Sequence, residues 1–189
     1  MSITTYFSLP QYELMLEAGI FDGQHLRRVE LIRGEIRDMN PIGVPHAMMV
    51  NELNDWSTRV LPSDAVWISV QNPIRIPSSQ SAPQPDVAWI ERKAYPDGHP
   101  LPDDVLLLIE VADSTLESDC GEKAQLYAEA GIKDYWVVAL EQRAIHVFRE
   151  PTGDGYQNKS IVGDEEELRP LAFADAVLKP TQLFAGKRG

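Results

Sequence analysis

Two carboxylates are the first candidates for chemistry in this sequence. Glu110 is the single charged residue in the run Val105–Val111, the most apolar stretch of the chain. A strand this apolar is expected to be buried on both faces, so a carboxylate within it needs a cation, a basic side chain or water as its partner. Asp86 follows Pro85 and opens the preceding apolar run, which predicts a second carboxylate at the mouth of the same sheet.

Carboxylate oxygens from neighbouring strands are the hard ligands that Mg²⁺ and Mn²⁺ prefer. Asp86 and Glu110 are therefore a candidate divalent-metal site. The same residues also fit a purely structural interpretation. In that case Asp86 caps a turn and Glu110 pairs with a basic group at the surface.

A third candidate group lies on the helix expected after the Glu110 strand. Asp119 stands near the predicted start of this helix, where a carboxylate can cap free backbone N–H groups, and Lys123 and Tyr127 follow at intervals of four residues. In a functional interpretation the Lys123 ammonium points at a substrate phosphate or an attacking water. In a structural one, Asp119 and Lys123 form a surface ion pair.

Other positions are accessory candidates, each with a structural alternative. Glu35 follows the turn residue Gly34 and either adds a carboxylate to the site or is an ordinary hairpin residue. His46 either orients a ligand or water or simply begins a helix, and Gln71 interrupts a strand-like run where it could bond a metal-bound water. Cys120 has no identifiable base, so a thiol nucleophile is not expected.

Length and composition set the limits for these candidates. The chain has 189 residues, 43% of them hydrophobic and 24% charged, which indicates one soluble globular domain over residues 1–189. Lys and Arg number 17 against 29 Asp and Glu, a net charge of -12 that argues against a protein coating nucleic acid non-specifically. We find no apolar run of membrane-spanning length and no signal-like N-terminus, so a cytoplasmic location is expected.

Periodicity and turn residues predict the elements that must position these side chains. Helices are expected from Ser8 to Gly19, over 46–61 and over 119–130, and a β-hairpin over 29–36. Strands are expected over 65–70, 73–76, 86–90, 105–111, 135–140, 144–148 and 156–162. This order predicts an α/β or α+β fold, a mixed central sheet flanked by helices around one core.

Taken together, these segments resemble the Uma-two restriction endonuclease family, a branch of the PD-(D/E)XK nuclease superfamily. The resemblance is strongest over residues 30–156. Its motifs are Glu30–Glu35, His46, Gln84–Val87, Leu107–Thr115, Asp119, Lys123, Tyr127–Ile132, Lys133–Val138, Arg149–Pro151 and Gly155–Tyr156. No single motif is specific, but their order and spacing together are.

The resemblance implies a restriction-endonuclease-like core in which carboxylates converge at one edge of the sheet. Asp86, Glu110 and the backbone carbonyl of Val111 would bind Mg²⁺ or Mn²⁺, and the metal would activate water and stabilise charge on a phosphate. The superfamily's usual lysine lies two residues after the glutamate, where this chain has Ala112. The resemblance therefore makes Lys123 the candidate replacement. Cys120 stands where related sequences often carry Arg.

The implied function is a metal-dependent endonuclease that acts on DNA, with Asp86, Glu110 and Lys123 as catalytic residues. Cleavage of both strands at symmetrical positions needs two sites, so a homodimer is expected. The rival hypothesis is a nuclease-fold protein that no longer cuts and serves as a binding or regulatory module. The acidic charge and the missing lysine at position 112 favour that rival. A clustered basic face close to Asp86 and Glu110 would favour the enzyme, whereas a site plugged by side chains, with Lys123 pointing away, would favour the rival.

Overall fold

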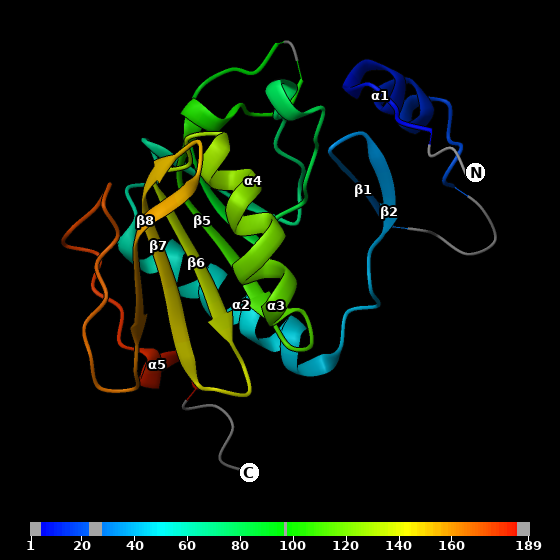
Figure 1. Cartoon of the computed structure of the whole chain (residues 1–189). Coiled ribbons are helices and arrows are strands. Elements are labelled where there is room, and N and C mark those ends of the chain that lie inside the picture. The colour runs from blue at the N-terminus through cyan, green and yellow to red at the C-terminus, as the bar shows by residue number, and fades with distance from the viewer. Residues whose placement is uncertain (1–4, 23–27, 97, 185–189) are drawn as a thin grey trace.

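A six-stranded sheet forms the centre of the computed structural model, which describes residues 5–22, 28–96 and 98–184 (Figure 1). The strands lie in the order β3-β4-β5-β6-β7-β8, and all neighbours are antiparallel except β5 and β6, which are parallel. The mixed sheet expected from the sequence is thereby confirmed. The strands are β3 (Val66–Val70), β4 (Val87–Glu91), β5 (Val105–Ala112), β6 (Asp134–Ala139), β7 (Ala144–Thr152) and β8 (Gly155–Val162).

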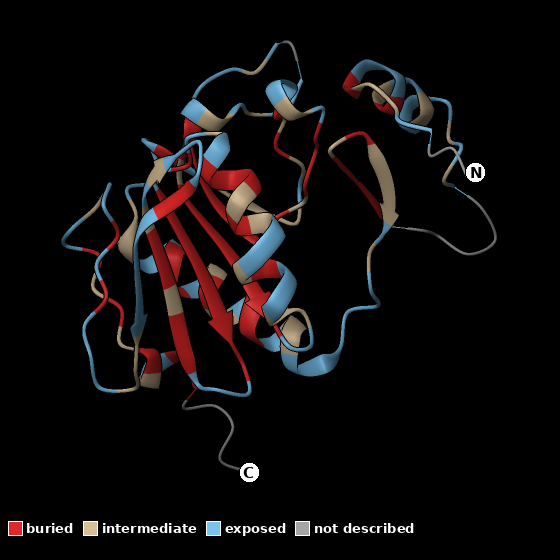
Figure 2. Ribbon diagram, in the orientation of Figure 1, coloured by how far each residue is buried: buried red, intermediate tan, exposed pale blue. Residues whose placement is uncertain are grey.

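Helices cover both faces of this sheet (Figure 1). On one face, α2 (Val44–Val60) buries its apolar side in a core that includes Trp56, Trp89 and Trp136. On the other, one continuous helical segment is formed by α3 (Leu116–Ser118), the π-helical turn η3 (Asp119–Lys123) and α4 (Ala124–Glu129). Alternate residues of β5 enter the two cores, so this strand is buried on both faces, as its composition predicts (Figure 2).

The hairpin of β1 (Val29–Ile32) and β2 (Glu35–Asp38) lies outside the large sheet. Its two-residue turn has positive φ at Arg33 (51°) and Gly34 (82°), the conformation that a tight hairpin requires. A Cβ at position 34 would lie 3.1 Å from the carbonyl oxygen of Phe7. Arg33 binds Glu129 at 2.8 Å, which ties the hairpin to α4.

The predicted strand over 73–76 is wrong. Gln71 has a φ of 54°, which turns the chain out of β3, and the following Pro73 has no N–H to donate to a ladder. Ile74 and Ile76 are nonetheless buried in the core beneath α4, which explains why the segment has an apolar alternation. Its backbone pairs outside the sheet, through the isolated bridge between Ile76 and Ser81 and the hydrogen bond from the Ile74 N–H to the Pro83 carbonyl oxygen at 3.0 Å.

Other boundaries differ by a few residues from the sequence expectations. The last helix before β6 begins at Leu116 rather than 119, and β7 continues to Thr152 rather than 148. Short elements complete the chain: α1 (Leu9–Glu17), capped by Ser8, the 3₁₀ turns η1 (Pro77–Ser79) and η2 (Pro102–Asp104), and α5 (Pro180–Phe184). Among the described residues, no helix is long and apolar enough to cross a membrane.

Candidate active site

Gln71, Asp86 and Glu110 form a row across three neighbouring strands. Val87 pairs with Ile109 in the antiparallel β4–β5 ladder, so one further step places Asp86 opposite Glu110. The Gln71 N–H donates to the carbonyl oxygen of Asp86 at 3.2 Å, which continues the row to β3. Directly opposed residues in an antiparallel pair point to the same face, so the carboxyl groups of Asp86 and Glu110 lie beneath the α3–α4 segment.

Asp86 is held by three donors. Its Oδ2 accepts hydrogen bonds from His46 Nε2 at 3.0 Å and from the Val111 N–H at 2.9 Å, and its Oδ1 accepts one from Gln71 Nε2 at 3.2 Å. Burial opposes the charge, but these donors outweigh it and lower the pKa of Asp86 below its ordinary value. Asp86 in turn raises the pKa of His46, mainly through the hydrogen bond between them.

The surroundings of Glu110 raise its pKa, whereas those of Asp86 lower it. Its Oε1 accepts hydrogen bonds from Lys123 Nζ at 3.0 Å and from the Tyr127 hydroxyl at 2.9 Å. Burial raises the pKa of Glu110 to about 8 against the attraction of Lys123, and the nearby carboxylates, Asp86 among them, add to the rise. Glu110 therefore keeps a proton more readily than Asp86 does.

Lys123 is the common partner of three carboxylates. Besides Glu110, its Nζ lies 3.9 Å from Glu30 Oε2 and 3.9 Å from Asp119 Oδ1. Burial opposes its charge, but these three acids raise the pKa of Lys123, so the ammonium stays protonated. The Asp119–Lys123 ion pair considered from the sequence is thus one of three contacts of Lys123, and Glu110 is its nearest partner.

The π-helical turn decides how these side chains point. Lys123 closes this turn and Tyr127 follows one turn later, so both point at Glu110 from one side of the segment. Single π turns inside helices are frequent at functional sites because the extra residue redirects side chains. The expected capping role of Asp119 is wrong: the helix begins earlier, and its Oδ2 accepts from the Thr115 hydroxyl at 2.5 Å.

Glu30 also belongs to the site, although the sequence predicted no role for it. It is 9% exposed, and its Oε2 accepts a hydrogen bond from the Gln84 N–H at 3.3 Å besides facing Lys123. The available signal was its place inside the apolar run Val29–Ile32, the same pattern that marks Glu110. Nothing local shows that the hairpin lies beside the large sheet.

Glu35 and Cys120 do not line the pocket that holds Asp86 and Glu110. Glu35 binds Arg37 at 2.8 Å. The same Arg37 binds Glu122 at 2.6 Å, so these ion pairs join the hairpin to the helical segment. The half-buried Cys120 packs against the core beneath α4.

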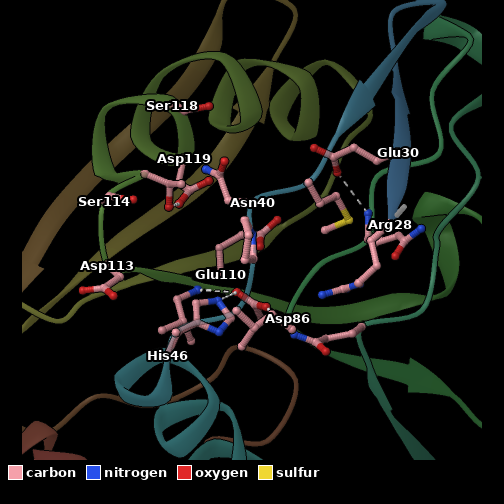
Figure 3. A pocket seen from close by; sticks show the side chains of 18 of the residues that line it. Arg28, Glu30, Asn40, His46, Asp86, Glu110, Asp113, Ser114, Ser118 and Asp119 are labelled. Carbon is pink, nitrogen blue, oxygen red and sulfur yellow. Dashed lines mark hydrogen bonds and ion pairs between the residues drawn. The ribbon is translucent and has the colours of Figure 1, made fainter. Parts of the chain in front are cut away.

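The remaining candidates open on one pocket of about 290 Å³ (Figure 3). Its lining includes six acids and three bases, so it has a surplus of negative charge. The acids are Glu30, Asp38, Asp86, Glu110, Asp113 and Asp119, and the bases are Arg28, Arg37 and Lys123. His46 and Gln71 also line it. In Figure 3 the Asp113–Asp119 wall faces Arg28 and Glu30, with Asp86 between them.

The donor set fits a hard divalent cation. Asp86 and Glu110 supply carboxylate oxygens on one face, and the surplus of acids would be reduced by a bound cation. Both hydrogen bonds of Glu110 use Oε1, and in the described residues none uses Oε2, which leaves that oxygen for another ligand. Within residues 5–22, 28–96 and 98–184, no three acidic, His or Cys side chains are already grouped as metal ligands.

Comparison with known proteins agrees with this architecture. A family model, Uma2, described as "Putative restriction endonuclease", matches residues 9–180. The chain belongs to the Uma2 family. A comparison with curated proteins finds no match.

A solved structure also shares the fold. It is described as "a putative nuclease belonging to DUF820 from Anabaena variabilis ATCC 29413". Its TM-score is 0.74 at 14% sequence identity, over 95% of this chain and 98% of the other. This confirms the restriction-endonuclease-like core expected from the Uma-two resemblance, and the family description supports a nuclease function.

Proposed function

We propose that this Uma2 protein is a metal-dependent endonuclease that hydrolyses phosphodiester bonds of DNA. One observation carries the proposal: Asp86 and Glu110 stand opposite each other on neighbouring strands, with Lys123 Nζ 3.0 Å from Glu110. Two carboxylates and a lysine around one pocket are suited to binding a divalent cation beside a phosphate. The family description supports the same class of reaction.

Asp86, Glu110 and the carbonyl of Val111 are the proposed ligands for Mg²⁺ or Mn²⁺. The Val111 N–H points at Asp86, and because N–H and C=O of one strand residue point to the same side, its carbonyl faces the same region. When bound, such an ion supplies an activated water and stabilises negative charge on phosphate. Asp86 is kept ionised by its three donors, so it is ready to accept a cation.

Lys123 is the proposed electrostatic stabiliser in place of the lysine missing at Ala112. Its ammonium already lies among the site's acids, so a helix side chain brings a positive charge to Glu110. His46 and Gln71 act through Asp86 by fixing its two oxygens, and both are positioning residues.

The direction of Lys123 favours the enzyme over a non-cutting binding module. That rival expects a blocked site with Lys123 turned away, whereas its Nζ points into the group of carboxylates that lines the open pocket. Among the residues that line the pocket, acids outnumber bases, so the clustered basic face expected of the enzyme is not found there. The surplus of acids instead suits a bound cation.

The experiment is a Mn²⁺ titration by calorimetry followed by cleavage assays on plasmid and linear DNA with Mg²⁺ or Mn²⁺. We expect saturable binding and cleavage for the wild type, and loss of both in Asp86→Ala and Glu110→Ala. Glu165→Ala, at an exposed acid outside the pocket, is the matched control. Metal-dependent cleavage that survives both site substitutions would overturn the assignment.

The oligomeric state is a separate part of the proposal. Symmetrical cleavage of a duplex requires two sites, which a homodimer supplies. Sedimentation of the wild type with and without duplex DNA measures it. A species that stays monomeric while cutting both strands would remove the dimer from the proposal and leave the site intact.

A further inference from the structure

The three basic residues of the pocket differ in whether their charge is already matched. Lys123 lies within 4 Å of three carboxylates. Arg37 is bound by Glu122 through both terminal nitrogens, at 2.6 and 2.9 Å, and by Glu35 at 2.8 Å. Arg28 also lines the pocket, but in the described parts of the chain its guanidinium has no ion pair or hydrogen bond.

Arg28 lines the same pocket as Asp86 and Glu110. It immediately precedes β1 and stands on the side of Glu30, facing the wall that carries Asp113, Ser114 and Ser118 (Figure 3). A bound phosphate between these walls would meet Arg28 without first breaking an ion pair.

The chemistry of guanidinium determines which ligand suits this position. The five N–H donors of an arginine form a planar fork that matches two oxygens of a phosphate, and the group never loses its charge at working pH. The pocket otherwise repels an anion, because it has six acids and its other two bases are neutralised. An unmatched arginine is the feature that lets an anionic substrate approach.

We propose that Arg28 binds a phosphate of the DNA strand that enters the pocket, opposite the wall formed by residues 113–119. This inference rests on the proposed nuclease function and names a substrate contact within it. Arg28 binds and orients the strand, whereas Lys123 remains with the carboxylates.

The test is equilibrium binding of a fluorescent 20-base-pair duplex, measured by anisotropy in Ca²⁺ at several salt concentrations. Ca²⁺ takes the same oxygen ligands and allows binding to be read apart from turnover. Arg28→Gln removes the charge and keeps hydrogen-bonding capacity, and Arg28→Lys keeps the charge without the fork. Arg59→Gln, an exposed arginine of α2 paired with Asp55, is the control.

We expect Arg28→Gln to weaken duplex binding about tenfold and to reduce the slope of log affinity against log salt by about one. Arg28→Lys should lose less affinity and keep the slope, and Mn²⁺ affinity measured by calorimetry should stay within about twofold of the wild type. Arg59→Gln should match the wild type in all three readouts. Circular dichroism checks that each variant is folded.

Two results separate failure of this inference from failure of the nuclease proposal. If the wild type binds and cuts DNA while Arg28→Gln binds with unchanged affinity and salt slope, Arg28 does not contact phosphate and only this inference falls. If the wild type binds no duplex under any of these conditions, both the DNA substrate and the role of Arg28 are overturned.

Discussion

The two halves of the site are built from the same chemical group in contrasting surroundings. Asp86 lies at the start of β4 among neutral and weakly basic donors, and its pKa is lowered. Glu110 lies one strand away in the middle of the sheet, shares its lysine with Glu30 and Asp119, and has a raised pKa. Burial acts on both, so the partners decide the difference.

Within the proposed metal site, this contrast assigns the two carboxylates different tasks as ligands. Asp86 is an ionised ligand fixed in place before any cation arrives, because three donors hold its two oxygens. Glu110 is an adaptable ligand, because Lys123 and a proton compete with a metal for it. Substitutions of the partners, rather than of the carboxylates, therefore test the comparison most directly.

Lys123→Met should have the largest effect, because it removes the single cation shared by three carboxylates. In the presence of a chelator we expect the free energy of unfolding to fall by about 3 kcal/mol, near the low end for a broken buried pair, since Glu110 can take up a proton. Mn²⁺ should restore stability and bind at least as tightly as to the wild type, while cleavage is lost. Urea unfolding and calorimetry measure the two effects.

The control for this substitution is Lys133→Met. Lys133 is exposed and forms no ion pair within the described residues. Its stability and metal affinity should equal those of the wild type. If Lys123→Met instead binds Mn²⁺ more weakly than the wild type, Lys123 does not compete with the metal and the contrast between the two carboxylates is wrong.

His46→Ala should act on the Asp86 half alone. Removing a group that orients a metal ligand costs about 10- to 100-fold in metal affinity, and we expect that loss for Mn²⁺ here. The free energy of unfolding in chelator should also fall, by about 1.5 to 3 kcal/mol, because His46 is the strongest of the donors that keep the buried Asp86 ionised. Calorimetry gives the affinity, and unchanged Mn²⁺ binding would show that His46 does not position Asp86.

Much of this architecture could be predicted from the sequence because it depends on local patterns. The apolar run around Glu110 and the Pro-Asp step before β4 predicted neighbouring buried strands, and the four-residue spacing of Lys123 and Tyr127 predicted their common face. Pairing of adjacent strands then brings Asp86 and Glu110 together. The family resemblance added the roles that spacing alone left open.

The features that could not be predicted depend on long-range packing. Glu30 reaches Lys123 only because the hairpin lies beside the helical segment. That placement depends on the bridge between Leu31 and Ala82, on burial of Ile32 beneath α4, and on ion pairs to Glu122 and Glu129 far along the chain. No residue pattern in the segment 119–123 predicts its π-helical turn. The segment 73–76 has the alternation of apolar residues that is typical of a strand, because Ile74 and Ile76 are buried in the core. It is nevertheless not a strand of the sheet.

Tyr127→Phe should make a smaller change on the Glu110 half. The substitution removes one buried hydroxyl that donates to Glu110 Oε1 at 2.9 Å and leaves the ring packing against Tyr135. A hydrogen bond of this kind contributes about 1 kcal/mol, so the free energy of unfolding should fall by about that amount. Mn²⁺ affinity should change less than in His46→Ala, and a larger loss would make Tyr127 essential for orienting Glu110.

The reactivity of Cys120 is the last test, and it leaves the site itself unchanged. The thiol lies next to Asp119 in the sequence but does not line the pocket. Burial raises the pKa of Cys120 to about 11, and the neighbouring Asp119 adds to the rise. Since the thiolate is the reactive form, alkylation by iodoacetamide at pH 8 should be on the order of 100-fold slower than for an exposed cysteine. The rate should rise about tenfold for each pH unit up to about 10, and denaturant should abolish the protection. A rate that levels off near pH 8.5 in the folded protein would show that neither burial nor Asp119 raises the pKa of this thiol.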